Sequence, residues 1–277
     1  MLNISSPQIC IGITPSSIAI ARVTGNLRKS NQIVAEKMLP LDQRGVFKHL
    51  CDQLTALLKE NGLRNASAKI VLSDALARFW MVQPPFNVST MLGLQAATAA
   101  RFQTLYGESP SQWTIQADYQ HDRPYLASAI PSAWLEAIEA VKRDFHMKIN
   151  EIAPQSVAAY NRWHHLLQAG SWLVNHQEGK IAIAITGEKK HIIGYRHIQC
   201  RSQDIADESS FTYFLRQQAL LMSIPLSNII CFPNLTHELS WLKFARAGQP
   251  NYRVLQKKLF DNLNTVSSGV DLALTGA

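Results

Sequence analysis

The stretch "CIGITPSSIAIARVTG", residues 10–25, decides how the chain begins to fold. Two arms rich in isoleucine, "QICIGI" and "IAIARV", flank the turn-forming residues Pro15, Ser16 and Ser17. Because β-branched residues favour strands and Pro with Ser favours a turn, this pattern predicts a β-hairpin near the start of the chain.

The segments that follow the hairpin extend it into a larger unit. Residues 32–41 read as a third strand, residues 42–62 as a helix and residues 68–74 as a further strand. The helix is expected to bury one apolar face, made of Phe47, Leu50, Leu54, Leu57 and Leu58. The same succession of strands, helix and strand returns between residues 171 and 233. A plan repeated on one chain predicts a duplicated α/β protein with two lobes.

A different arrangement separates the two copies. Residues 89–146 read as a long helix, a hairpin and a second helix, so that they form a strand-strand-helix insert. We therefore expect residues 1–88 and 147–170 to form the first lobe, residues 89–146 an inserted α/β subdomain and residues 171–277 the second lobe.

The charge distribution argues against a dedicated nucleic-acid surface. The net charge is +7, with 15 Lys and Arg against 11 Asp and Glu in residues 1–150, and 12 against 9 in the remainder. Small excesses spread along both halves do not make the basic stripe that a duplex requires. We expect a loosely basic, solvated surface and no specific nucleic-acid partner.

Cysteine usage and the absence of export signals bear on the compartment. Three of the four cysteines, among them Cys10 and Cys231, lie between apolar neighbours and are expected to be buried thiols, which suits a reducing compartment. The first 25 residues lack the basic start and apolar region of a signal peptide. No apolar run approaches the roughly 18 residues of a membrane span. We expect a cytoplasmic protein.

The order of elements resembles that of the actin-like ATPase fold, shared by actin, Hsp70 and sugar kinases. Within that fold the chain resembles the PilM-like assembly proteins of type IV pili and the cytoplasmic domains of type II secretion L proteins. The likeness covers nearly the whole chain, through "IGITPSSIAIARV", "VLSDALARFWMVQPP" and "GVDLALTGA", and the insert is its most diagnostic part. In this family the fold binds a short peptide of a membrane partner, and some members also bind ATP between the lobes.

The resemblance implies two glycine-bearing hairpin turns that grip phosphates, with acidic residues nearby to hold Mg²⁺. At the first turn this chain lacks the family's Asp and Gly, and Pro15 removes a backbone N–H. At the turn chosen as the second, Gly187 is present without the Asp, and Glu188 and Lys189 would either replace lost contacts or remain solvated. We therefore expect a degenerate nucleotide cleft with no catalytic residue and no cofactor, ATP binding without turnover remaining open. Its vestigial lining would be Thr14, Ser16, Ser17, Thr186, Gly187 and Ser268.

Other catalytic and metal-binding patterns are missing from the sequence. Adjacent residues His164 and His165 would point in different directions on a helix, and His191 and His197 stand too far apart on one strand to share a metal. No glycine-rich phosphate loop and no nucleophile elbow occurs. We expect neither a metal site nor an enzyme.

The insert hairpin carries aromatic residues that would suit peptide capture, by strand addition or in a groove. On this partner-binding surface we place Phe79, Trp80, Trp113, Ile115 and Tyr119. The resemblance then implies a non-catalytic scaffold on the cytoplasmic, inner-membrane face of a pilus or secretion assembly platform, peripheral to the membrane. Its partner would be the cytoplasmic tail of a bitopic assembly protein, with a motor ATPase as a second candidate. The alternative is an active ATPase or small-molecule kinase with an atypical phosphate site.

Overall fold

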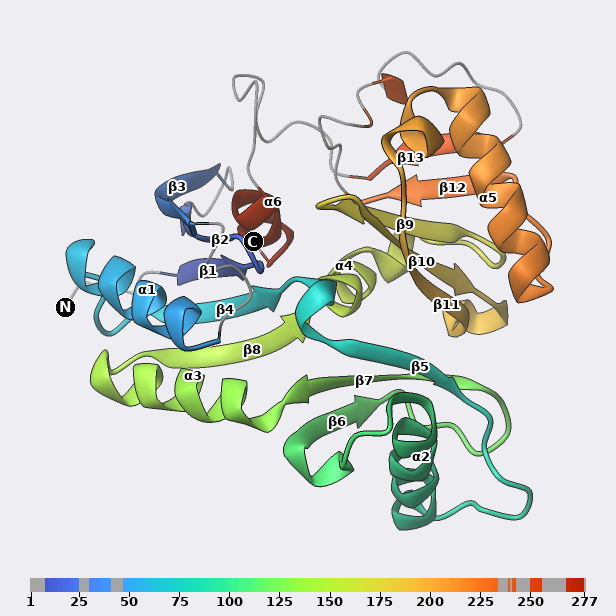
Figure 1. Cartoon of the computed structure of the whole chain (residues 1–277), viewed down its shortest axis with the longest axis horizontal. Helices are drawn as coiled ribbons and strands as arrows, with labels where there is room; N and C mark the ends of the chain where they lie inside the picture. Colours follow the sequence, from blue (N-terminus) through green and yellow to red (C-terminus); the bar gives the residue numbers. More distant parts are fainter. Residues whose placement is uncertain are drawn as a thin grey trace. The chain divides into compact units, whose positions relative to one another are not determined.

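The computed structural model describes residues 8–24, 30–40, 47–233, 239, 241–242, 250–255 and 268–276 (Figure 1). The chain divides into two compact units, each of which is described here by itself. The first unit takes its residues from 1–77, 132–159 and 258–277, and the second from 78–131 and 160–257. No helix in the described ranges is long and apolar enough to cross a membrane.

The first unit is built on a five-stranded sheet with the order β3-β2-β1-β4-β8. The strands β1, β2 and β3 form the predicted antiparallel meander, and β4 and β8 continue the sheet in parallel with β1. The elements of this unit are β1 (Gln8–Ile13), β2 (Ser17–Thr24), β3 (Ser30–Met38), α1 (Phe47–Glu60), β4 (Ser67–Leu72), α3 (Ser132–Asp144), β8 (Lys148–Pro154), the start of α4 (Gln155–Trp163) and α6 (Ser268–Gly276).

The alternation of small and large residues in the opening hairpin explains how this sheet is covered on both faces. In the β1–β2 register Gly12 lies opposite Ala19 and Cys10 opposite Ala21, so these small residues share one face. The helix α6 packs closely on that face, where Val270 and Ala273 contact Ala19 and Ala21. The isoleucines between them point to the other face and are buried.

The second unit repeats this sheet and adds the insert. Its five-stranded sheet has the order β11-β10-β9-β12-β13, with β9, β10 and β11 antiparallel and β12 and β13 parallel to β9. Aromatic residues of α5, Phe211 and Phe214, pack on Trp172 and the isoleucines of β10. The elements of this unit are β5 (Arg78–Val82), α2 (Met91–Tyr106), β6 (Trp113–Ala117), β7 (Tyr125–Pro131), β9 (Trp172–Gln177), β10 (Lys180–Thr186), β11 (Ile192–Gln199), α5 (Glu208–Met222), β12 (Ile229–Phe232) and β13 (Asn251–Val254).

The two five-stranded sheets have the same strand order and the same directions, so the predicted duplication is confirmed. The strands β1, β2, β3, β4 and β8 correspond to β9, β10, β11, β12 and β13. The helix α1 lies between the third and fourth strands of one copy, and α5 holds that place in the other. This correspondence fixes which turns of the two copies are equivalent.

The insert is a three-stranded antiparallel sheet, β5-β7-β6, with α2 against one face. The predicted boundaries differ from the compact units in four places, one of which is residues 160–170, which belong to the second unit. The strand β5 belongs to the insert sheet because it pairs with β7. The helix α3 belongs to the first unit. Its Trp134 packs edge to face on Phe47 of α1, with the ring centroids 4.6 Å apart. The terminal helix α6 also belongs to the first unit, because it packs on β1 and β2.

Candidate functional site

Polar residues collect at the carboxyl edge of the first sheet. The register aligns the last residues of three parallel strands, Ile13, Leu72 and Pro154. The residues that follow them are polar and buried, namely Thr14, Ser17, Ser73, Asp74, Gln155 and Ser156. Ligands of open α/β sheets bind at such carboxyl ends, so this edge is the candidate site of the first unit.

The turn between β1 and β2 satisfies its own backbone donors. The Oγ1 atom of Thr14 accepts the backbone N–H of Ser16 at 3.0 Å and that of Ser17 at 2.8 Å. The N–H of Thr14 itself donates to the carbonyl of Ser17 at 2.9 Å. Since Pro15 has no N–H, every backbone donor of residues 14–17 is engaged within the turn.

The hydroxyl groups of the same turn also bond one another. Thr14 Oγ1 lies 3.1 Å from Ser17 Oγ and 3.2 Å from Ser16 Oγ. Thr14 and Ser17 are fully buried, and Ser16 is half-buried. The structure thus brings the three predicted residues of the first turn together, around the hydroxyl of Thr14.

Asp74 is the buried carboxylate of this edge, and sequence reasoning gave it no role. Its Oδ1 accepts the backbone N–H of Ser156 at 2.9 Å, and its Oδ2 accepts the hydroxyl of Ser156 at 2.5 Å. Ser156 lies in the first turn of α4, where a carboxylate satisfies free N–H groups and the helix dipole. Asp74 therefore ties the end of β4 to the start of α4. The sequence signal was the polar pair Ser73-Asp74 directly after a buried strand.

The equivalent turn of the second copy joins β9 to β10 and consists of Glu178 and Gly179. Both residues have positive φ, 49° and 71°, which makes this a two-residue hairpin turn that favours glycine at its second position. The carbonyl of Gly179 accepts hydrogen bonds from the N–H of Cys200 and from Nε2 of Gln199, both at 2.9 Å. This turn retains a glycine and an acidic residue, unlike the first.

Three buried polar residues precede that turn and were missed at the level of sequence. Asn175, His176 and Gln177 end β9, and each is less than a tenth exposed. The signal was available, because "NHQEG" follows the apolar "WLV" just as "TPSS" follows "IGI". Together with Glu178 they make the carboxyl edge of β9 the candidate site of the second unit.

Thr186 and Gly187, the predicted second phosphate turn, do not occupy the position in the second sheet that residues 14–17 occupy in the first. They follow β10, which runs antiparallel to β9, and so lie beside the start of β9 rather than its end. The N–H of Thr186 donates to the carbonyl of Ser171 at 3.0 Å, and its Oγ1 donates to the carbonyls of Gln168 at 2.6 Å and Ser171 at 3.1 Å. The structure places this pair at the edge of the second sheet opposite to Glu178.

Packing explains the glycine at position 187. A Cβ atom there would lie 2.5 Å from Cγ2 of Ile193 and 3.0 Å from Cε1 of His191. The N–H of Gly187 donates to the carbonyl of His191 at 2.7 Å. The neighbouring Lys190 is tied down as well, since its Nζ donates to the carbonyl of His165 at 2.9 Å. The side chains of His191 and Ile193 therefore fill the space beside Gly187.

Ser268 is the first residue of α6, and the two residues before it lie outside the described ranges. It belongs to the first unit with Thr14, whereas Thr186 and Gly187 belong to the second.

The five predicted partner-binding residues do not share one surface. Trp80 is only 4% exposed and packs on Phe102 of α2, with ring centroids 5.2 Å apart. Half-buried Trp113, Ile115 and Tyr119 line the same side, against α2.

Phe79 lies on the opposite face of the insert sheet. Successive residues of a strand point to opposite faces, so Phe79 and Trp80 cannot line one groove. The ring of Phe79 stacks on Tyr195 of β11, with centroids 4.7 Å apart.

The outer edge of β6 remains available in the insert. The N–H of Asp118 donates to Leu126 of β7, and alternation along an antiparallel pair then turns the N–H groups of Ile115 and Ala117 away from β7. No strand within the described residues pairs with that edge. At the other edge, the hydroxyl of Tyr106 donates to the carbonyl of Phe79 at 2.7 Å, and burial raises the pKa of this tyrosine.

No protein-family model matches the sequence, and no protein of curated function matches it. Solved structures match in fold. A PilM-PilN type IV pilus biogenesis complex aligns with 91% of this chain and 88% of that chain, at 12% identity and a TM-score of 0.62. A Bacteroides thetaiotaomicron protein of unknown function, described as having an actin-like ATPase fold, aligns over 92% and 94% at 9% identity and a TM-score of 0.58.

The cytoplasmic domain of EpsL, an inner-membrane component of the type II secretion system of Vibrio cholerae, also matches. It aligns over 98% of this chain and 93% of that chain, at 8% identity and a TM-score of 0.54. At such identities the likeness concerns the fold alone. It confirms that the chain has the actin-like fold predicted from the order of its elements, in the form that pilus and secretion proteins also have.

Proposed function

We propose that this protein is a non-catalytic actin-like scaffold of a type IV pilus or type II secretion assembly platform, and that it binds a short cytoplasmic peptide of a membrane partner. The fold supports the first part, because solved proteins of both systems align with nearly the whole chain. The second part extends to this chain what the matched PilM-PilN complex is, an assembly of two proteins.

The observation that carries the proposal is the hydroxyl of Thr14. A phosphate-binding turn works by pointing free N–H groups at the anion. In the turn 14–17 the N–H groups of Ser16 and Ser17 already donate to Thr14 Oγ1, so this side chain takes the place of a phosphate oxygen. Binding ATP here would first require those two bonds to be broken.

The carboxylate of the same edge supports a structural function too. Phosphoryl transfer depends on Mg²⁺ and on electrostatic stabilisation around it. Asp74, the one buried carboxylate among the described residues, already accepts two hydrogen bonds from Ser156. Its negative charge therefore stabilises the N-terminus of α4.

A titration with Mg-ATP, followed by calorimetry and by phosphate release, tests the non-catalytic part. We expect neither heat nor release up to about 1 mM ATP, a concentration that would reveal any Kd of physiological relevance. Binding without release would make ATP a structural ligand and refute the closed turn. Turnover that Ser17→Ala abolishes, and that the exposed control Ser111→Ala leaves intact, would establish the ATPase or kinase alternative.

The outer edge of β6 is the proposed place of the partner peptide. An extended peptide that adds to a sheet edge needs the outward N–H and carbonyl groups of that strand. Ala117 presents such an N–H, whereas the N–H of Gln116 points into the ladder with β7. A proline at each position therefore separates binding from folding.

The test uses synthetic peptides of the cytoplasmic tails of bitopic inner-membrane proteins from the pilus or secretion systems of the same genome. Ala117→Pro is expected to lower peptide affinity at least about tenfold with little change in stability. Gln116→Pro is expected to lower the free energy of unfolding by about 2 kcal/mol, since it removes a ladder bond. Unchanged affinity in Ala117→Pro would move the peptide site away from β6.

A further inference from the structure

The helix α5 exposes an apolar stripe on its outer side. Tyr213 is 64% exposed, Leu220 80% and Leu221 64%, although the helix buries Phe211 and Leu215 on the other side. The i, i+7 spacing places Tyr213 and Leu220 on one face, two turns apart, whereas Leu221 lies about 100° further round the helix. Large exposed apolar residues in such an array mark an interaction surface more often than chance.

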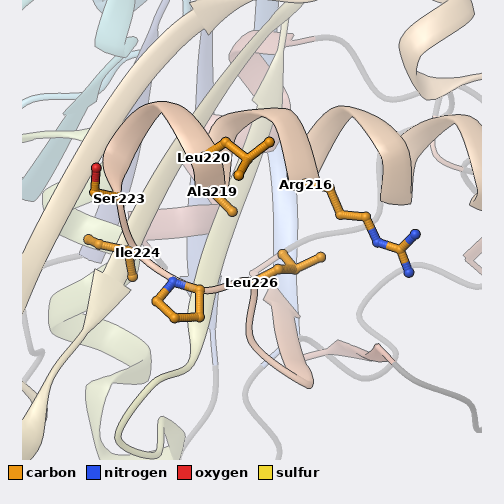
Figure 2. Close-up of a pocket in the computed structure, with 7 residues that line it drawn as sticks. Arg216, Ala219, Leu220, Ser223, Ile224 and Leu226 are labelled. Atoms are coloured by element: carbon orange, nitrogen blue, oxygen red, sulfur yellow. The ribbon is translucent and has the colours of Figure 1, made fainter.

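The stripe runs into an open pocket at the end of the helix. The pocket has a volume of about 600 Å³ and lies between the last turns of α5 and the loop 224–226, as Figure 2 shows. Arg216, Ala219, Leu220 and Ser223 line it from the helix. Ser223 ends the helix with a left-handed φ of 54°, which turns the chain back so that Ile224, Pro225 and Leu226 form the second wall.

Arg216 gives one end of this apolar pocket a positive charge. It is the ionisable residue of the lining, and it lies at the end of the pocket opposite to Ser223 (Figure 2). None of the ion pairs and hydrogen bonds found among the described residues involves its guanidinium group. A ligand that places a carboxylate beside Arg216 would gain an ion pair while its apolar groups fill the pocket.

We propose that this surface, Tyr213 to Leu226, is a docking site for an amphipathic helix of a protein partner, in which one Asp or Glu lies among leucine-like residues. The concave pocket takes inserted side chains, which distinguishes it from a flat membrane-binding surface. A second copy of the same helix fits poorly, because a two-fold axis at the middle of the stripe would bring two Arg216 side chains together. The site is independent of the nucleotide turns and of the β6 edge.

The probe is an alanine-based helical peptide of about 16 residues that presents leucines on one face with a single Glu among them. Its matched control carries Lys in place of Glu. Methyl resonances of Leu220, Ile224 and Leu226 report binding to the whole protein. We expect the Glu peptide to bind about fivefold more tightly than the Lys peptide, the size of one surface ion pair. In Arg216→Glu the preference is expected to reverse.

Two variants separate the site from the rest of the surface. Leu220→Asp is expected to weaken both peptides at least about tenfold, because it puts a charge where a leucine must pack. Leu105→Asp changes a leucine that is also exposed, on α2, and is expected to leave both affinities unchanged. Equal affinity for the two peptides, or no binding of either, would overturn the proposal. So would a dimer that Leu220→Asp dissociates, or Leu220-dependent binding to phosphatidylglycerol–phosphatidylethanolamine vesicles in place of the peptide.

Discussion

The two equivalent hairpin turns of the duplicated sheets satisfy their backbone hydrogen-bonding groups in different ways. The first turn, residues 14–17, uses the hydroxyl of Thr14 to hold two N–H groups. The second, Glu178-Gly179, is a two-residue turn that needs two left-handed residues and holds the carbonyl of Gly179 against the end of β11. A shared sheet order thus preserves the position of a turn without preserving its chemistry.

The two turns differ in what they offer to a phosphate group. A turn filled by its own side chain offers nothing to a phosphate, whereas a turn that ends in glycine still permits close approach of the backbone. The scaffold proposal therefore depends most on Thr14, and this is the residue whose replacement should matter most.

Thr14→Val is the change with the largest expected effect. Valine has the shape of threonine but cannot accept the N–H groups of Ser16 and Ser17, and the second of these is buried. We expect the free energy of unfolding to fall by about 2–3 kcal/mol, the cost of donors left without acceptors. Urea denaturation measures it. A loss below about 0.5 kcal/mol would mean that water or another group replaces the hydroxyl.

Much of this fold follows from the sequence. The alternation in "IGI" and "IAIA" predicted the strands, and the meander-helix-strand order predicted the duplication. The isoleucines bury a whole face of the sheet, so few other arrangements would satisfy them.

The equivalent turn of the second copy was missed, although "NHQEG" lies before the "IAIA" of β10 as "TPSS" lies before the "IAIA" of β2. Both β2 and β10 contain "IAIA", and the turn after β10 has a Gly that suits a phosphate. The order of strands in the sheet shows that the turn after β10 lies at the edge opposite to the turn after β9.

Sequence reasoning also grouped the five partner-binding residues on one surface, although they lie on two faces of the insert sheet. Alternation along β5 would have separated Phe79 from Trp80, but it does not tell which face a helix covers. The structure shows that α2 covers the face of Trp80, so the tryptophan belongs to the core of the insert.

The second sheet contains a histidine that should make the stability of the protein depend on pH, and the first sheet has no such residue in the corresponding strand. His197 on β11 is half-buried near Lys180, and the burial lowers its pKa from 6.5 to about 4. The corresponding strand β3, "SNQIVAEKM", has no histidine. Between pH 6.5 and pH 4 the unfolded chain holds the proton that the folded protein excludes, so stability falls as pH falls through this window.

The expected loss attributable to His197 is about 2 kcal/mol or less between pH 7 and pH 5. Urea denaturation of wild type and His197→Gln at both values measures it, with the exposed His121→Gln as the control. The stability of His197→Gln should change less with pH than that of wild type. Equal pH dependence of the two proteins would show that other groups cause the acid sensitivity.

Gly179→Ala tests whether the second turn needs its glycine. At φ 71° an alanine is strained, and its Cβ would lie 3.2 Å from Nε2 of Gln199. We expect stability to fall by about 1–2 kcal/mol. Gly170→Ala makes the same change at φ 79° with no atom within 4 Å of the new Cβ, so it measures the backbone strain alone. An equal loss in the two variants would show that the contact with Gln199 adds nothing to the cost of Gly179→Ala.

Glu178→Asn has the smallest expected effect and the opposite sign. The first position of this turn has φ 49°, where asparagine is more comfortable than glutamate, and Asn-Gly is the preferred pair for two-residue hairpins. We expect a gain of about 0.5 kcal/mol in the free energy of unfolding, seen as a small rise of the urea midpoint. A loss would mean that the interactions of Glu178 outweigh the backbone strain.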